Sequence, residues 1–134
     1  MRVMLDTNIL ISGMIFQGSE RRLLETILKN NHVLVLGRQT KQEAKAVLTR
    51  KFSISEKFLN IFLKMFSIEW IPISSSIETE KLKTLIRDPK DIPILAAAVS
   101  AKPDLFVTGD KDFHTPEVKK LIPVYTATQA LNSL

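Results

Sequence analysis

Residues 104–113 read DLFVTGDKDF, and this stretch decides the fold class. A short apolar run ends at Gly109, and two aspartates, Asp110 and Asp112, follow the glycine on either side of a lysine. The start of the chain repeats the arrangement, because the apolar residues of RVMLDTN run directly into Asp6. Apolar runs without polar alternation are typical of strands covered on both faces of a sheet. Acids that end such strands predict a site at one edge of a parallel sheet.

The rest of the chain alternates predicted strands with predicted helices. Strands are predicted at residues 2–5, 32–37, 104–109 and 122–126, with a weaker one at 68–73 that Pro72 interrupts. Helices are predicted at residues 20–30 with Ser19 as the cap, and at 38–51, 55–66, 76–86, 91–102 and 127–134. Pro93 fits the first turn of its helix. The alternation predicts a single three-layer α/β/α domain, residues 1–134, around a mainly parallel central sheet.

The composition is that of a globular protein with a basic surface. The 134 residues include 19 Lys and Arg against 14 Asp and Glu, a formal net charge of +5, which favours polyanionic partners. The absence of cysteine excludes disulfides, thiolate zinc sites and cysteine nucleophiles, and it is compatible with a reducing compartment. No apolar run approaches the roughly 18 residues of a membrane span. We therefore expect a cytoplasmic protein that does not contact a membrane.

Four carboxylates are predicted to meet at the carboxyl edge of the sheet. Asp6 and Asp110 end or closely follow predicted strands. Glu43 lies about two turns into the helix after the second strand, and Asp91 opens an alanine-rich helix. Such acids repel one another in a partly desolvated cleft, so a cation is required among them. An all-oxygen set of ligands favours Mg²⁺ or Mn²⁺ over zinc, with Asp112 as an outer or substitute ligand.

Four motifs together resemble the PIN domain ribonucleases. They are LDTNIL (residues 5–10), the glutamate of TKQEAKAVL (residues 40–48), RDPKDIPILAAAV (residues 87–99) and LFVTGDKDF (residues 105–113). Each motif is weak alone, but their order, their spacing and their match to the predicted strands and helices are specific. The resemblance covers nearly the whole chain. It implies a PIN-like fold and the cleavage of RNA with Mg²⁺ or Mn²⁺ as cofactor.

The resemblance also implies roles for particular residues. The metal-binding and catalytic acids would be Asp6, Glu43, Asp91 and Asp110, and Asp112 corresponds to a position that is often acidic but not always required. The residues that support these acids would be Thr7, Asn8 and Thr108. Many small members of the family are toxins of toxin–antitoxin pairs, similar to the VapC type. The implied partners are therefore an RNA substrate and an antitoxin protein.

Phosphodiester hydrolysis requires an activated water, charge relief on the nonbridging oxygens and a stabilised leaving oxygen, all of which metal ions can supply. Asp6, Asp91 and Asp110 would hold one or two cations. Glu43 would either complete the coordination or orient the attacking water as general base. The basic residues expected to hold the RNA backbone are Arg38, Lys41, Lys45, Lys90 and Lys111. With one Trp and one Tyr in the chain, strong sequence reading through aromatic platforms is not indicated.

Several of these residues also have simpler structural explanations. Asp6 could cap a helix that starts near Asn8. Asp88 is expected to be a turn or cap residue, and His114 to be structural or exposed. Glu43, taken alone, has the character of a solvated helix charge. The alternative function is a PIN-like module that binds RNA or a protein without cleaving it.

The helix predicted at residues 55–66 is apolar almost all round. The expected core stripe consists of Phe58, Leu59, Phe62, Met65 and Phe66, and it leaves out Ile61 and Leu63. The two leftover residues predict a covered surface, either a homodimer seam or a groove for an antitoxin helix. A fully buried helix is the alternative.

Overall fold

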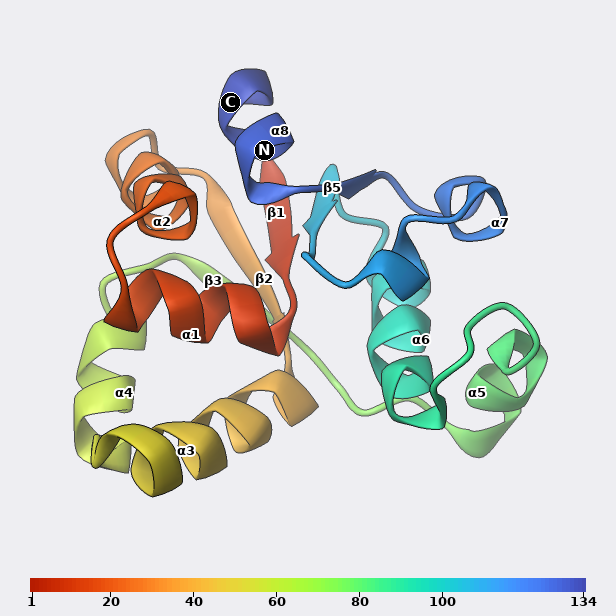
Figure 1. Ribbon diagram of the computed structural model, residues 1–134, viewed down its shortest axis with the longest axis horizontal. Helices are drawn as coiled ribbons and strands as arrows, with labels where there is room; N and C mark the ends of the chain where they lie inside the picture. Colours follow the sequence, from red (N-terminus) through yellow and green to blue (C-terminus); the bar gives the residue numbers. More distant parts are fainter.

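The computed structural model has one five-stranded sheet between two layers of helices (Figure 1). It describes the backbone of residues 1–134 and the side chains of all of them except Ile77. The strand order is β3-β2-β1-β4-β5, and every neighbouring pair is parallel. The strands are β1 (Arg2–Leu5), β2 (Val33–Gly37), β3 (Ile68–Ile71), β4 (Leu105–Val107) and β5 (Val124–Tyr125). The predicted three-layer α/β/α class is confirmed.

Helices alternate with the strands along the chain. The α-helices are α1 (Thr7–Ile15), α2 (Ser19–Lys29), α3 (Arg38–Phe52), α4 (Glu56–Leu63), α5 (Ser76–Leu82), α6 (Ile92–Ala101), α7 (Pro116–Lys119) and α8 (Ala127–Ser133). Two 3₁₀ turns, η1 (Pro89–Asp91) and η2 (Lys111–Phe113), precede α6 and follow β4. The predicted cap of α2 was wrong, because Ser19 is already helical and Gly18 takes the cap position without a side-chain hydrogen bond.

Both faces of the sheet are buried, which explains the unbroken apolar strands. Val3 and Leu5 of β1 pack with residues of α1 to α4 and α8, whereas Met4 packs with residues of α6 and α7. In Figure 1, α1 to α4 lie on one side of the sheet and α5 to α7 on the other. Successive strand side chains point to opposite faces, so each face needs an apolar residue. None of the helices among the described residues is long and apolar enough to cross a membrane.

The order of the strands reverses between β1 and β4. From β1 the chain moves outward through β2 to β3, and it then returns through α5 and α6 to place β4 on the other side of β1. Open α/β sheets bind ligands at the carboxyl ends of the strands at such a reversal. Leu5 pairs with Val107, so the next residues, Asp6 and Thr108, leave their strands at the same level. The topology therefore places both residues at the expected site.

Helix α4 corrects one expectation. Leu59 and Leu63 are its buried residues, whereas Phe58, Ile61 and Met65 are exposed. The predicted stripe was therefore wrong for Phe58, Met65 and Leu63, and the fully buried alternative was wrong too. Nearly every residue of this helix is apolar, so the pattern could not indicate which side faces the core. In the structure, Leu59 and Leu63, at positions i and i+4, form the side that faces the core. Large apolar side chains on the other sides are left in solvent.

Candidate metal centre

Asp6 both caps a helix and faces the neighbouring strand. It follows β1 and takes the N-cap position of α1, where its Oδ1 accepts a hydrogen bond of 2.9 Å from the backbone N–H of Ile9. Its Oδ2 accepts a hydrogen bond from the hydroxyl of Thr108 at the end of β4. Asp6 is almost fully buried. The capping explanation of Asp6 is thus confirmed for one oxygen, while the other oxygen points across the strand-order reversal.

Thr108 joins Asp6 to the acidic turn after β4. Its side chain is fully buried, and its hydroxyl also accepts a hydrogen bond of 3.1 Å from the backbone N–H of Asp110. The carbonyl oxygen of Thr108 lies 2.8 Å from Nε2 of His114, so this ring nitrogen carries the proton. Asp110 then caps η2, because its Oδ1 accepts a hydrogen bond of 2.9 Å from the N–H of Asp112. The expected structural role of His114 is confirmed: it holds the turn closed.

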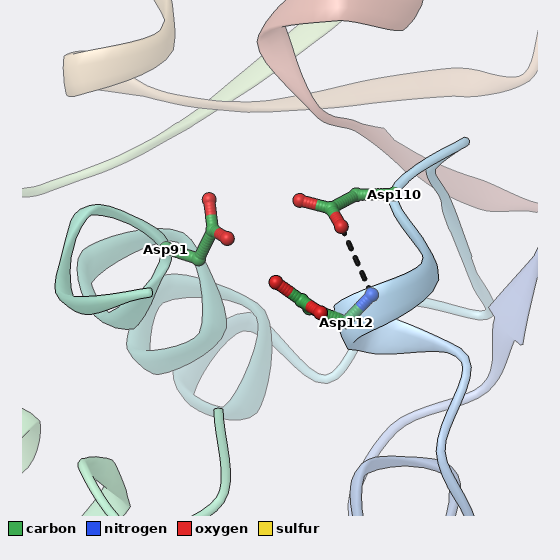
Figure 2. A group of neighbouring side chains, drawn as sticks. All are labelled: Asp91, Asp110 and Asp112. Atoms are coloured by element: carbon green, nitrogen blue, oxygen red, sulfur yellow. Dashed lines mark hydrogen bonds between the residues drawn. The ribbon is translucent and has the colours of Figure 1, made fainter. Parts of the chain in front are cut away.

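Three carboxylates converge beside this turn. Asp91, Asp110 and Asp112 each offer an oxygen, and these oxygens all lie within 4.8 Å of one another. Figure 2 shows Asp91 at the start of α6 facing Asp110 and Asp112 across a common space. Opposite ligands of an octahedral Mg²⁺ lie about 4.2 Å apart, given bonds of about 2.1 Å. Small side-chain movements would therefore let one hard divalent cation contact all three oxygens.

The electrostatics of the group favour a bound cation. The pKa of Asp91 is raised from 3.8 to about 6, first by burial, then by the charge of Asp110 and a hydrogen bond with it, and further by Asp88 and Asp112. Burial also raises the pKa of Asp6, although the hydrogen bonds from Thr108 and from the backbone N–H groups of α1 oppose the rise. The guanidinium of Arg87 lies 3.6 Å from Asp112, but this arginine is highly exposed. Solvent screening makes such a pair weak, so most of the negative charge is left for a metal ion to neutralise.

Glu43 lies outside this group of three. Its side chain is exposed on α3, and its Oε2 accepts a hydrogen bond of 3.0 Å from the hydroxyl of Thr7, the residue after Asp6. Asn8 is exposed in the first turn of α1, and its backbone N–H is one of the groups that lower the pKa of Asp6. The structure thus brings Glu43 to the end of β1 through Thr7. It does not place Glu43 among the oxygens that surround the common space.

Two further contacts lie next to Asp91, one of them expected from the sequence and one not. The side chain of Asp88 accepts a hydrogen bond of 3.0 Å from the N–H of Lys90, which confirms its expected capping role. Gln39 was not predicted to act, yet its Nε2 donates a hydrogen bond of 3.2 Å to the carbonyl of Pro93. This contact ties the start of α3 to the first turn of α6, next to Asp91. A side-chain amide in a first helical turn gives no sequence signal for such a partner.

Comparison with known proteins identifies the family. A family model described as PIN domain matches residues 2–112, so the chain belongs to the PIN domain family. A search of curated proteins found no match. Solved structures are similar over nearly the full length of the chain, which agrees with the PIN-like fold implied by the motifs.

Three of these structures illustrate the similarity. A chain of VapBC2 from Rickettsia felis, bound to a DNA fragment from their promoter, is 23% identical, with a TM-score of 0.68 over 94% of this chain and 98% of that one. A chain of a toxin–antitoxin complex from Klebsiella pneumoniae is 25% identical, with a TM-score of 0.67 over 93% and 97%. A chain of FitAcB from Neisseria gonorrhoeae is 16% identical, with a TM-score of 0.64 over 94% and 98%.

Proposed function

We propose that this PIN domain is a metal-dependent endoribonuclease that hydrolyses RNA phosphodiester bonds. The observation that carries the proposal is the convergence of Asp91, Asp110 and Asp112 beside the linked pair of Asp6 and Thr108. PIN domains are nucleases, so the family supports hydrolysis of a nucleic acid. The net charge of +5 supports a polyanionic substrate.

The residues of the site divide into two roles. Asp91, Asp110 and Asp112 would hold Mg²⁺ or Mn²⁺, a cation that lowers the pKa of a bound water and offsets charge on phosphate oxygens. Asp6 also lies outside the group of three and both of its oxygens accept hydrogen bonds, but its charge acts on Asp110 and its oxygens retain lone pairs, so it would contribute negative charge beside the ion. Glu43 lies outside the group of three and is oriented by Thr7. This arrangement favours Glu43 as the base that orients the attacking water, rather than as a metal ligand.

Cleavage of a mixed RNA pool, with Mn²⁺, with Mg²⁺ and with chelator, tests the activity. We expect metal-dependent cleavage by the wild type and none by Asp110→Asn or Asp6→Asn. Asn caps a helix about as well as Asp, so Asp6→Asn should keep the start of α1 intact, although it disturbs the hydrogen bond from Thr108; urea denaturation should therefore accompany the assay. The matched control is Asp88→Asn, since Asp88 caps η1 three residues from Asp91 and lies outside the group of three. Full activity in Asp110→Asn would reject the site.

Glu43→Gln separates metal binding from water activation. If Glu43 acts as general base, the variant should bind Mn²⁺ with wild-type affinity but lose cleavage, whereas Asp110→Asn should lose both. Calorimetric titration with Mn²⁺ measures the first quantity and the RNA assay the second. Wild-type Mn²⁺ binding without any cleavage by the wild type would instead favour the alternative, a PIN-like module that binds RNA or a protein without cutting.

We further propose that the protein is the toxin of a toxin–antitoxin pair. The structures of similar fold include a toxin–antitoxin complex from Klebsiella pneumoniae. A groove of about 280 Å³ between α2 and α4 is lined by Leu24, Leu28, Phe58, Phe62 and Met65, among others. Phe58 is 54% exposed and Met65 is 53% exposed, which is unusual for such large apolar side chains. An antitoxin helix would cover them.

Growth of a bacterial host tests the toxin proposal. Expression of the wild-type chain should arrest growth, and expression of Asp110→Asn should not. Coexpression with the product of the adjacent gene should relieve the arrest, and Phe58→Ser should weaken this relief without reducing RNA cleavage. Relief that is unchanged in Phe58→Ser would place the antitoxin elsewhere.

A homodimer remains a separate proposal for the exposed side of α4. Ile61 is 55% exposed and does not line the groove between α2 and α4. Sedimentation at high concentration should show a dimer for the wild type and a monomer for Ile61→Ser. A wild-type monomer would reject this part. The cytoplasmic location stays a prediction from the sequence.

A further inference from the structure

A second groove lies outside the metal centre, between α3, α4 and β3. Its volume is about 410 Å³, and its lining includes Lys41, Asn60, Leu63, Lys64, Phe66 and Trp70. The groove therefore combines an aromatic and apolar wall with two ammonium groups and one amide. This combination suits a ligand with a flat ring and negative charge, because rings stack on aromatic side chains while lysines bind phosphates.

Two positively charged side chains lie over the ring of Trp70 at this groove. The guanidinium carbon of Arg38 lies 5.8 Å from the centroid of the Trp70 ring, and Nζ of Lys41 lies 5.6 Å from it. Both cations belong to the first turn of α3. Cations at this distance are attracted by the electron-rich ring face, so the indole holds them at the groove.

The nearby acids are already paired. Glu69, which precedes Trp70 in β3, is bonded to Arg2. Glu56 lies 2.9 Å from Nζ of Lys45. Glu56 has Lys45 as its main partner and Lys41 as a weaker one, so much of the charge of Lys41 and the charge of Lys64 remain for a ligand. This charge favours a polyanion over an apolar or acidic protein segment as the occupant.

One end of the groove, at Trp70, lies near the carboxyl edge of the sheet where the metal centre is found. Trp70 pairs with Leu36, and the register of β1 with β2 places Leu36 level with Leu5, the residue before Asp6. Neighbouring strands lie about 4.8 Å apart, so β3 is about 10 Å from β1 and about 14 Å from β4, the strand that leads to Asp110 and Asp112. Helix α3 begins between the two sites and carries Arg38 and Lys41. An RNA strand that leaves the acids along this edge would reach Trp70 within a few nucleotides.

We propose that this groove is a nucleotide subsite for single-stranded RNA, an inference that rests on the proposed ribonuclease function. One base of the substrate stacks on Trp70 once Arg38 and Lys41 turn from the ring to the flanking phosphates, where Lys64 also binds. The RNA must be unpaired here, since bases within a duplex are not free to enter a groove. Stacking tolerates any base, so the subsite positions the strand and adds little sequence preference.

Binding to single-stranded RNA without metal tests the subsite separately from catalysis. Trp70 is the only tryptophan in the chain, so its fluorescence reports on the groove directly. Titration of the wild type with a short unlabelled single-stranded RNA in chelator should quench this fluorescence. Variants are compared by the anisotropy of a dye-labelled copy of the same RNA. Trp70→Ala should weaken binding by about 5- to 150-fold, the range expected for one base stacked on an aromatic ring.

Charge variants and controls complete the test. Lys41→Gln and Lys64→Gln should each weaken binding severalfold and lower the salt dependence, the slope of log K against log salt, by about one unit. Trp70→Phe keeps an aromatic ring and should lose less affinity than Trp70→Ala. The matched control is Lys120→Gln, an exposed lysine at the end of α7 on the other side of the sheet. The RNA affinity of Lys120→Gln should fall by less than the RNA affinity of the groove variants.

The outcomes separate the subsite from the nuclease. Wild-type RNA affinity in Trp70→Ala, Lys41→Gln and Lys64→Gln would overturn the subsite even if RNA is cleaved. Affinity that depends on Trp70 while no condition gives cleavage would support the subsite and reject the nuclease. If Trp70→Ala does not fold, the two lysine variants decide. If the wild type binds duplex RNA as tightly as single-stranded RNA, the proposal is also overturned. The same holds if the groove variants change the sedimentation of the protein but not its affinity for RNA.

Discussion

Thr108→Val should destabilise the protein, although valine has nearly the same shape as threonine. The hydroxyl of Thr108 donates to Oδ2 of Asp6 and accepts from the N–H of Asp110, and the side chain is fully buried. A hydrogen bond to a charged group contributes about 1.5–3 kcal/mol, and a backbone N–H left without a partner adds about 1 kcal/mol. The expected loss in the free energy of unfolding is therefore about 2.5–4 kcal/mol.

Urea denaturation in chelator measures this loss directly, and thermal denaturation gives an independent value. A domain of 134 residues has an unfolding entropy of about 280 cal/mol/K at its melting temperature, so each kcal/mol corresponds to about 3.5 °C. The expected fall in Tm for Thr108→Val is about 9–14 °C. Removal of a residue that orients a metal ligand typically weakens metal binding about 10- to 100-fold, so the affinity for Mn²⁺ should fall as well.

Thr108→Ser is the matched control, because it keeps the hydroxyl and removes one buried methyl group. Its expected cost is about 1 kcal/mol, typical of the loss of one methyl from a core. Thr108→Val could lower the free energy of unfolding by less than about 1 kcal/mol, or Thr108→Ser could lower it by as much as Thr108→Val. In either case the methyl contact, rather than the hydroxyl, stabilises this part of the structure. The inferred link between Asp6 and Asp110 through Thr108 would then be refuted.

Four further predictions concern the metal centre and the core. Millimolar Mn²⁺ should raise the Tm of the wild type but not of Asp110→Asn in a thermal shift assay, because binding to the folded state alone is stabilising. The pKa of Asp91 is raised to about 6, so calorimetry should show Mn²⁺ affinity falling as pH drops below about 6, where the proton competes with the metal. Without metal, the folded chain binds this proton more tightly than the unfolded chain, so urea denaturation should show stability falling from pH 4 to pH 6, and Asp91→Asn should reduce this change; Asp6, whose pKa is also raised, contributes the remainder. Gly13→Ala should cost about 1–3 kcal/mol, because the added Cβ would lie 2.3 Å from Cδ1 of Leu24 where α1 meets α2; an unchanged urea midpoint would show that α2 can shift.

The fold could be predicted because each strand carries apolar residues for both faces of the sheet. Val3 and Met4 are adjacent in sequence and pack in opposite layers, a pattern that requires helices on both sides. Helix α7 could not be predicted in this way, since four residues are too few to show a helical period. The buried side of α4 was missed for the opposite reason, because almost all of its residues are apolar.

The sequence predicted which strands and helices carry the candidate site, but not which side-chain atoms meet there. Asp6 and Asp110 follow strands, and the topology of a parallel sheet brings such residues to one edge. The sequence could not show that Thr7 holds Glu43 apart from the group of Asp91, Asp110 and Asp112. That separation depends on side-chain rotamers and on how α3 packs against α1, which the order of residues does not specify.

The hydrogen bond between Asp6 and Thr108 joins residues that are 102 positions apart. During translation, Asp6 leaves the ribosome long before the second half of the centre has been synthesised. A partly made chain therefore lacks Thr108, Asp110 and Asp112, so the acidic centre can form only after β4 and the turn that follows it have emerged. A truncated product that stops before β4 could not form this centre for the same reason.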